Sequence, residues 1–176
     1  MDMMAAPSAR LHPGDPAPDF TAPSTVNPAF HFNTIGGHRA VLVFLNGPER
    51  LQARKVLAAA LASLRSKGVH VFGVVPGPDA SVAADQDGTN LPITLFRDVD
   101  GAIARRFRMV TPRQGETPPS LLNGAYVIDE SVRIVGFQPL APLESLTQRL
   151  HDMLDRIPPR EPPVTVERQA PVLVVP

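Results

Sequence analysis

The side chains that could carry chemistry in this sequence are limited by one absence, because none of the 176 residues is cysteine. The chain therefore has no thiol nucleophile, no disulfide and no thiolate metal site. Histidine is the next candidate, but no two of the five histidines have the i, i+4 helical spacing that brings two imidazoles to one metal. His31 and His38 could face each other across a turn, although we favour exposed loop histidines there. His70 is interpreted as a strand residue with a local partner, and no metal site is predicted.

Two groups of polar side chains could bind an anion. Asn46 and Arg50 stand at the start of a predicted helix, where free N–H groups favour negative charge, although Glu49 in the same turn opposes it. A second group could bind a phosphate or the acidic patch of a partner, since guanidinium groups pair with anions in a bidentate way. This group consists of Arg105, Arg106 and Arg108. A solvated helix face is the interpretation of these arginines that we favour.

No recognisable catalytic motif is present. The sequence has no glycine-rich phosphate loop, since Gly36 and Gly37 indicate a turn, and no Ser-His-Asp arrangement has a supporting motif. Asp98 and Asp100 are paired carboxylates, but their position before an apolar segment is typical of helix caps. The sequence therefore predicts no catalytic residue and no cofactor.

The anion-binding candidates at 46 and 50 follow a strand and begin a helix. Residues 40–45 form a continuous apolar run, which predicts a strand buried on both faces. A helix is expected from about 49 to 67, with Leu57, Leu61 and Leu64 on one face. Residues 69–75 predict a second buried strand. A strand–helix–strand unit of this length joins parallel strands through a right-handed crossover.

The second half of the chain predicts a different connectivity. Residues 91–96 indicate a short extended piece, preceded by a short polar helix at 79–85 and followed by a helix at 98–107 capped by Asp98 or Asp100. Residues 125–128 and 133–137 predict an antiparallel hairpin, and 143–157 predict a helix with apolar residues at 3–4 spacing. The predicted class is α/β, with a central mixed β-sheet flanked by helices on both faces.

Composition places the chain among ordinary globular proteins, with 43% hydrophobic residues and a formal net charge of zero. A neutral chain has no broad electrostatic field toward nucleic acid or an anionic membrane, so we expect neither as a partner. No apolar run reaches the ~18 residues that a membrane span needs. The first 13 residues lack the apolar stretch of a signal peptide, which makes a cytoplasmic location the default expectation.

Proline marks the ends of the predicted domain. The 21 prolines gather near both termini, where they favour extended segments over helices and sheet ladders. We expect a flexible arm at 1–10, one folded domain at 11–157, and a proline-rich tail at 158–176. Residues 164–176 are strand-like and apolar, and such a segment is expected to pair with a sheet edge. We expect this tail to pair with a second copy of the chain in a homodimer, or with a fused or partner C-terminal domain.

Four segments, in order along the chain, resemble a known family. They are Pro13–Phe20, Ile35–Phe44, Leu95–Gly101 and Ala125–Asp129. Together they resemble the peroxiredoxins of the alkyl hydroperoxide reductase/thiol-specific antioxidant (AhpC/TSA, or redoxin) group, over roughly residues 11–157. The resemblance implies a thioredoxin-like fold.

The active-site motif of that family is not present. Peroxiredoxins follow the first central strand with Pro-x-x-x-Thr-x-x-Cys, in which the cysteine thiolate attacks the peroxide. With Asn46 in the proline position, Arg50 takes the threonine position and Ala53 the cysteine position. The family also has an arginine before the hairpin strand, and Asn123 occupies that place. The thioredoxin Cys-x-x-Cys is absent as well. The resemblance therefore implies a naturally degenerate domain.

Three functional hypotheses follow from this resemblance. The first is a catalytically inactive peroxiredoxin-like domain that acts in binding or assembly. The second is an oxidoreductase-class protein of antioxidant type whose chemistry is not thiol-based, using a vestigial pocket at Asn46, Arg50 and Asn123. The third is an accessory domain of a 2-oxoglutarate/iron(II) oxygenase, because cysteine-free redoxin domains occur ahead of such oxygenases and the tail resembles that junction.

Overall fold

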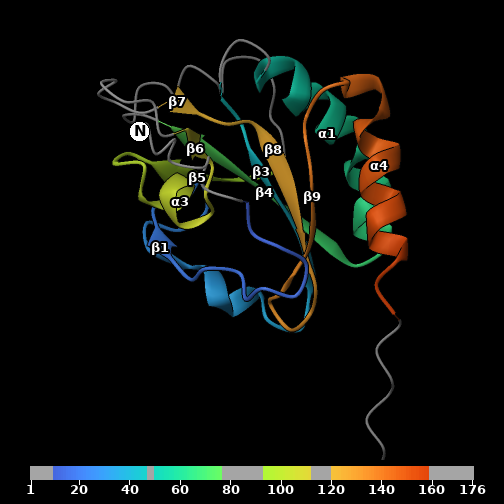
Figure 1. Cartoon of the computed structure of the whole chain (residues 1–176), viewed down its shortest axis with the longest axis horizontal. Helices are drawn as coiled ribbons and strands as arrows, with labels where there is room; N and C mark the ends of the chain where they lie inside the picture. The colour runs from blue at the N-terminus through green and yellow to red at the C-terminus, as the bar shows by residue number, and fades with distance from the viewer. Residues whose placement is uncertain (1–9, 47–49, 77–92, 112–119, 159–176) are drawn as a thin grey trace, which may run out of the picture.

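A five-stranded mixed β-sheet forms the centre of the protein (Figure 1). The computed structural model describes residues 10–46, 50–76, 93–111 and 120–158. The strand order in the sheet is β5-β4-β3-β8-β9. These strands are β3 (Arg39–Phe44), β4 (Val69–Pro76), β5 (Thr94–Asp98), β8 (Gly124–Ile128) and β9 (Ile134–Gln138). Two small sheets add β1 (Thr21–Ala22) with β2 (Phe30–His31), and β6 (Val110–Thr111) with β7 (Ser120–Leu121).

The predicted strand–helix–strand unit is confirmed. Strand β3 leads into helix α1 (Arg50–Ser66), which returns the chain to β4 in parallel register. β3 is buried along almost its whole length, which explains why its sequence is a continuous apolar run rather than an alternating one. β5 extends the parallel set on the far side of β4. The parallel unit was therefore predicted correctly, whereas the extended piece expected at 91–96 is the strand Thr94–Asp98, whose parallel pairing was not predicted.

The predicted hairpin is also confirmed. β8 pairs antiparallel with β3 on one side and with β9 on the other, which makes the sheet mixed. The β8–β9 turn is fixed by Asp129, whose side-chain Oδ1 accepts hydrogen bonds from the backbone N–H groups of Ser131 and Arg133. Asp129 thus acts as a turn residue through its short polar side chain.

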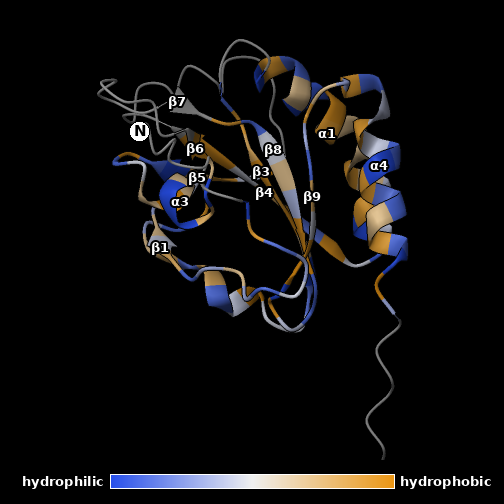
Figure 2. Cartoon of the chain, in the orientation of Figure 1, coloured by the Kyte–Doolittle hydropathy of each residue, from blue (hydrophilic) through white to orange (hydrophobic). Residues whose placement is uncertain are grey.

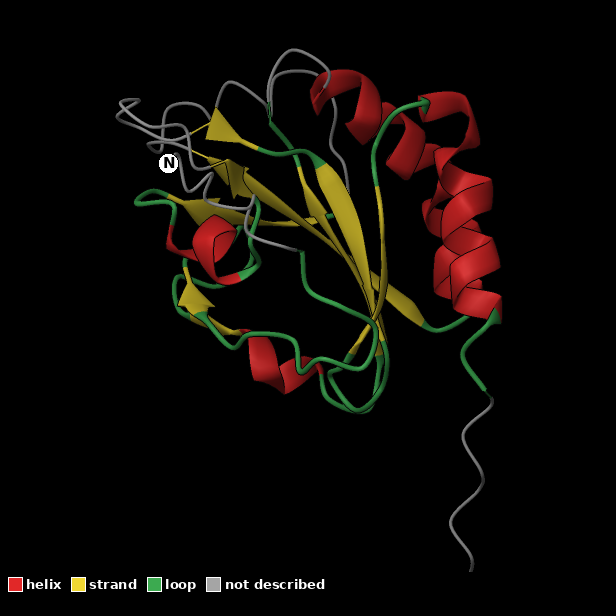
Figure 3. Cartoon of the chain, viewed as in Figure 1, coloured by secondary structure: helices red, strands yellow, loops and turns green. Residues whose placement is uncertain are grey.

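Two long helices cover one face of the sheet (Figure 3). They are α1 and α4 (Leu143–Asp155), which pack side by side. Their inward faces carry the apolar residues and their outward faces the polar ones (Figure 2). Leu57 and Leu64 from α1 and Leu150 from α4 are completely or almost completely buried against this face. Amphipathic spacing thus builds one of the two apolar cores.

The opposite face is covered by the N-terminal segment, the 3-10 helix η1 (Phe32–Ile35) and the short helix α3 (Ala102–Arg106). Helices therefore lie on both faces, as predicted. Phenylalanine dominates this second core, in which Phe20 stacks on Phe32 and meets Phe96 edge-on. In the same core the hydroxyl of the buried Tyr126 donates to the Phe107 carbonyl at 2.8 Å. The proline-rich segment after residue 10 is extended, as its prolines favour. It packs over this face of the sheet as part of the folded domain.

This N-terminal segment also hydrogen-bonds to both outer strands of the central sheet. At β5, the Thr25 N–H donates to the Leu95 carbonyl at 3.1 Å, and the Arg97 N–H donates to the Pro23 carbonyl at 3.0 Å. At the start of β9, the Ile134 N–H donates to the Asp15 carbonyl at 2.8 Å. The segment from about 14 to 25 thus spans the sheet from one edge to the other.

Some predictions differ from the structure or lie outside it. The helix expected at 98–107 is only Ala102–Arg106, because β5 continues through Asp98 and its pairing with β4 takes precedence. The predicted helix at 79–85 and the tail at 164–176 lie outside the described residues. Within the described ranges, no helix is both long and apolar enough to cross a bilayer.

Candidate functional site

The structure brings together two of the three residues predicted to line a vestigial pocket. The backbone N–H of Asn46 donates to the side-chain Oδ1 of Asn123 at 2.7 Å. The contact follows from sheet register, because Phe44 of β3 lies opposite Gly124 of β8, and both asparagines stand just beyond that pair. Arg50, the third residue, is the first residue of α1. The site therefore lies at the carboxyl end of β3, before helix α1.

Ala53 lies in the apolar core beneath this site. Its exposed fraction is 0%, and it belongs to the same buried cluster as Leu45 and Leu57. The family register assigns the reactive thiol to this position. A thiol that reacts with solutes needs access to solvent, whereas this side chain faces packed hydrocarbon. The residue type and its environment therefore agree with each other.

The cavity beside Asn46 has about the volume that a single water molecule needs. Its volume is about 10 Å³, compared with the roughly 10–15 Å³ that one water requires. It is lined mostly by apolar side chains, the full set being Phe44, Leu45, Asn46, Val74, Asp98, Ala104 and Leu122. Among the described residues, this cavity offers no room for an organic ligand.

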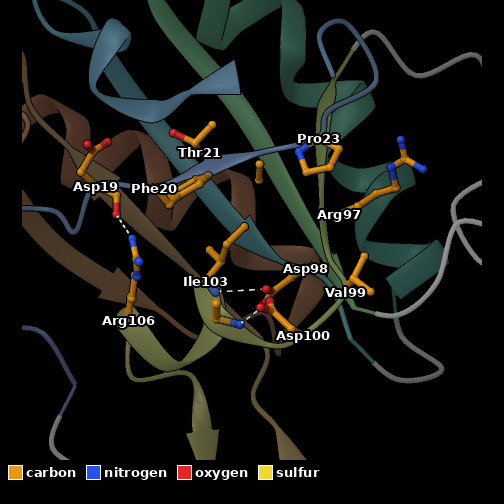
Figure 4. Close-up of a pocket in the computed structure, with 12 residues that line it drawn as sticks. Asp19, Phe20, Thr21, Pro23, Arg97, Asp98, Val99, Asp100, Ile103 and Arg106 are labelled. Atoms are coloured by element: carbon orange, nitrogen blue, oxygen red, sulfur yellow. Dashed lines mark hydrogen bonds between the residues drawn. The ribbon is translucent and has the colours of Figure 1, made fainter. Parts of the chain in front are cut away.

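Asp98 is the one buried carboxylate among the described residues of this region, and its two oxygens are already occupied. Oδ1 accepts from the Ile103 N–H at 3.0 Å (Figure 4), and Oδ2 accepts from the Ala104 N–H at 2.9 Å. Asp100 accepts from the Ala102 N–H at 3.1 Å. Both aspartates thus satisfy N–H groups of the first turn of α3, although the N-cap residue itself is Gly101 rather than either predicted aspartate.

A wider hollow of about 610 Å³ lies between the N-terminal segment, the end of β5 and α3. Figure 4 shows Arg97 at one end and Arg106 at the other, with Phe20 and Ile103 between them. Arg106 donates through Nη1 to the backbone carbonyl of Asp19. Of the predicted arginine cluster, Arg106 lines this hollow, whereas Arg105 and Arg108 are not among its described lining residues. The three arginines therefore do not converge on one anion site there.

His31 and His38 are exposed and His70 lies on a strand, as expected, but the less favoured contact between His31 and His38 is not formed. His31 does not meet His38: its Nδ1 lies 2.8 Å from the Thr21 hydroxyl. His38 instead lies beside His70, with ring centroids 4.8 Å apart. Sequence spacing missed this pair because the residues are separated by the whole of α1. The parallel strand prediction contained a usable signal, since strands that begin together place residues 38 and 70 near each other.

Comparison with known proteins identifies the family. The model of the AhpC/TSA family matches residues 13–136, which is well over half of the chain. The chain belongs to the AhpC/TSA family. It is also similar to a Mycobacterium tuberculosis (strain H37Rv) protein with the provisional name of peroxiredoxin Rv2521. The two are 25% identical over 133 residues, which cover 73% of this chain and 85% of that protein.

Solved structures confirm the thioredoxin-like fold. The peroxidoxin BcpB of Mycobacterium tuberculosis superposes with a TM-score of 0.73 at 15% identity, covering 85% of this chain and 99% of BcpB. The bacterioferritin comigratory protein of Xanthomonas campestris gives a TM-score of 0.70 at 14% identity, covering 86% of this chain and 99% of that protein. At these identities the likeness concerns the fold alone.

As an AhpC/TSA domain, this chain keeps the architecture and departs at the centre of the site. Asn46, Arg50, Ala53 and Asn123 replace the proline, threonine, cysteine and arginine of the family motif in the register given above. The Asn46–Asn123 hydrogen bond shows that the motif positions still converge. The ligand-binding role of Asn46, Arg50 and Asn123 stays a prediction. The chain therefore keeps the fold of the family without the cysteine that its motif contains.

Proposed function

We propose that this chain is a catalytically inactive peroxiredoxin-family domain that acts in binding or assembly. The observation that carries the proposal is Ala53. A methyl group stands where the family register puts the thiol, its exposed fraction is 0%, and the sequence contains no cysteine elsewhere to take over the role. Because the thiolate is the species that attacks a peroxide or a disulfide, neither reaction is open to this chain.

The geometry also gives little support to an enzyme that uses other chemistry at this position. An enzyme site needs a concave pocket with convergent polar groups. Here the cavity next to Asn46 has a volume of about 10 Å³. The nearby carboxylate of Asp98 is occupied by two backbone N–H groups. These features favour a structural use of the fold over the oxidoreductase alternative.

Assembly through the C-terminal tail is the specific form of this proposal. Residues 171–176 are Pro-Val-Leu-Val-Val-Pro, an apolar segment that gains from pairing with a sheet or a second copy of the chain. We therefore propose a homodimer, or a contact with a further domain, mediated by residues 164–176. The accessory-domain alternative for an oxygenase uses the same tail.

The mass of the protein in solution tests this proposal. Light scattering would be measured for the whole chain, for a chain that ends at Arg160, and for a full-length control with Val172→Asp and Val174→Asp. We expect a dimer for the whole chain and a monomer for both variants, with unchanged circular dichroism. Three monomers would refute homodimerisation through the tail and direct the search to a further domain.

A further inference from the structure

Two exposed histidines meet at the beginning of the parallel strands β3 and β4. His70 is the second residue of β4 and lies opposite Ala40 of β3, while His38 precedes β3 by one residue. Side chains two positions apart on a strand share a face, so His38 and His70 lie on the same side of the sheet. Their ring centroids are 4.8 Å apart and the ring planes meet at 57°. No step of the proposed function uses this pair.

We propose that His38 and His70 together bind one divalent late transition-metal ion, of the class of Cu²⁺, Ni²⁺ or Zn²⁺, with water completing its coordination. Imidazole nitrogen is the ligand type that suits these ions. With Zn–N bonds of roughly 2.0–2.1 Å, each nitrogen about 1.1 Å from its ring centroid and a bond angle of about 100°, two ligating rings have centroids about 5 Å apart. The observed separation of 4.8 Å fits this value.

Both imidazoles are open to solvent, which can supply the water ligands of the ion. Both histidines are exposed, so rotation about χ2 can turn one nitrogen of each ring toward the space between them.

The electrostatic surroundings of His70 keep its imidazole available as a ligand. Burial, His38 and Arg65 each lower the pKa of His70, in that order of size. A lowered pKa leaves the imidazole of His70 neutral near pH 7, and neutral imidazole is the form that ligates metal. The positive charge of Arg65 also opposes a bound cation.

Calorimetric titration of the tag-free full chain with CuCl₂, NiCl₂ and ZnCl₂ tests the site. We expect one ion per chain, with Cu²⁺ bound most tightly and Mg²⁺ not bound. His38→Ala and His70→Ala should each weaken binding by about 100-fold, because a second ligand on the same scaffold raises affinity by at least that factor. His31→Ala, which removes another exposed histidine, should leave it unchanged. The proposal would be overturned if His38→Ala and His70→Ala bound the ions as tightly as the parent protein and His31→Ala do.

Paramagnetic broadening in a ¹H–¹⁵N spectrum locates the ion independently. Substoichiometric Cu²⁺ should first broaden the amides around residues 38–40 and 69–71, and this pattern should vanish in His38→Gln. Broadening centred on His12, His31 or His151 instead would overturn the assignment. His38→Gln keeps a polar side chain of similar length at an exposed position, so its spectrum also shows that the fold is intact.

Discussion

Placing a cysteine at position 53 tests whether this position is sealed from solvent. Ala53→Cys places the only thiol of the chain at a site whose exposed fraction is 0%. Adding a sulfur to packed core costs about 1–3 kcal/mol, so the variant should be folded but less stable. Leu51→Cys is the matched control, because residue 51 lies in the same turn of α1 and Leu51 is 52% exposed.

The expected protection can be worked out from the packing. A reagent reaches the thiol of Ala53→Cys only when the start of α1 separates from the core, which exposes the buried side chains of Leu45 and Leu57. Exposing each leucine costs about 1.5–3 kcal/mol, or about 3–6 kcal/mol for both. Because each 1.4 kcal/mol is a factor of ten, this thiol should react about 10²–10⁴ times more slowly than the thiol of Leu51→Cys. Burial also raises the pKa of a thiol, which slows the reaction further.

The assay is the rate of reaction with an aromatic disulfide reagent under native conditions. Both variants should release one equivalent of product at the same rate in urea, which confirms that each thiol is intact. Hydrogen peroxide consumption should remain at the background level for Ala53→Cys. If Ala53→Cys reacts as fast as Leu51→Cys in buffer, position 53 is open to solvent, and the inference from its burial is wrong.

Two further predictions concern the packing that supports the site. Tyr126→Phe removes the hydrogen bond to the Phe107 carbonyl and should lower the free energy of unfolding by about 1–2 kcal/mol at pH 7, measured by urea titration. Burial raises the pKa of Tyr126 above its usual value of 10.0. The free energy of unfolding of the parent should therefore fall as the pH rises from about 10 through this raised pKa, and Tyr126→Phe should not show this fall. Parallel plots of unfolding free energy against pH for the two proteins would contradict this. Gly124→Ala should cost about 1–3 kcal/mol because the new Cβ meets the Phe137 ring, whereas Gly36→Ala, with no contact under 3.4 Å, should be near neutral. Equal melting temperatures for the two alanine variants would show that the Phe137 ring moves aside freely.

Local patterns in the sequence were sufficient for most of the fold. The apolar run at 40–45, the leucine spacing in α1 and the turn at Asp129 each report on neighbouring residues, so the parallel unit and the hairpin could be predicted. The helix at 98–107 was predicted too long because an aspartate at position 98 is compatible with two local structures. It is a good helix cap, and it also ends a strand whose pairing with Pro76 depends on a distant segment.

The candidate site divides in the same way. Asn46 and Asn123 could be named from the family motif, and their contact follows from the pairing of β3 with β8. The His38–His70 pair could not be named from spacing along the chain, because it depends on the register between two strands joined by α1. The burial of Ala53 likewise depends on how closely α1 packs on the sheet, which no local pattern records.

The N-terminal segment reaches from β5 to β9, so it limits where the chain can be shortened or joined to another protein. Its backbone hydrogen bonds at Leu95 and Ile134 occupy groups that would otherwise be free to recruit strands from other molecules. A chain cut near Gly36, just before the first central strand, would keep α1 and α4 on one face but uncover both edges of the sheet and the face that carries Phe72 and Phe96. Such a fragment should aggregate during expression. Any fusion, duplication or recombination that preserves a soluble domain must therefore carry the residues from about 10 onward as part of it.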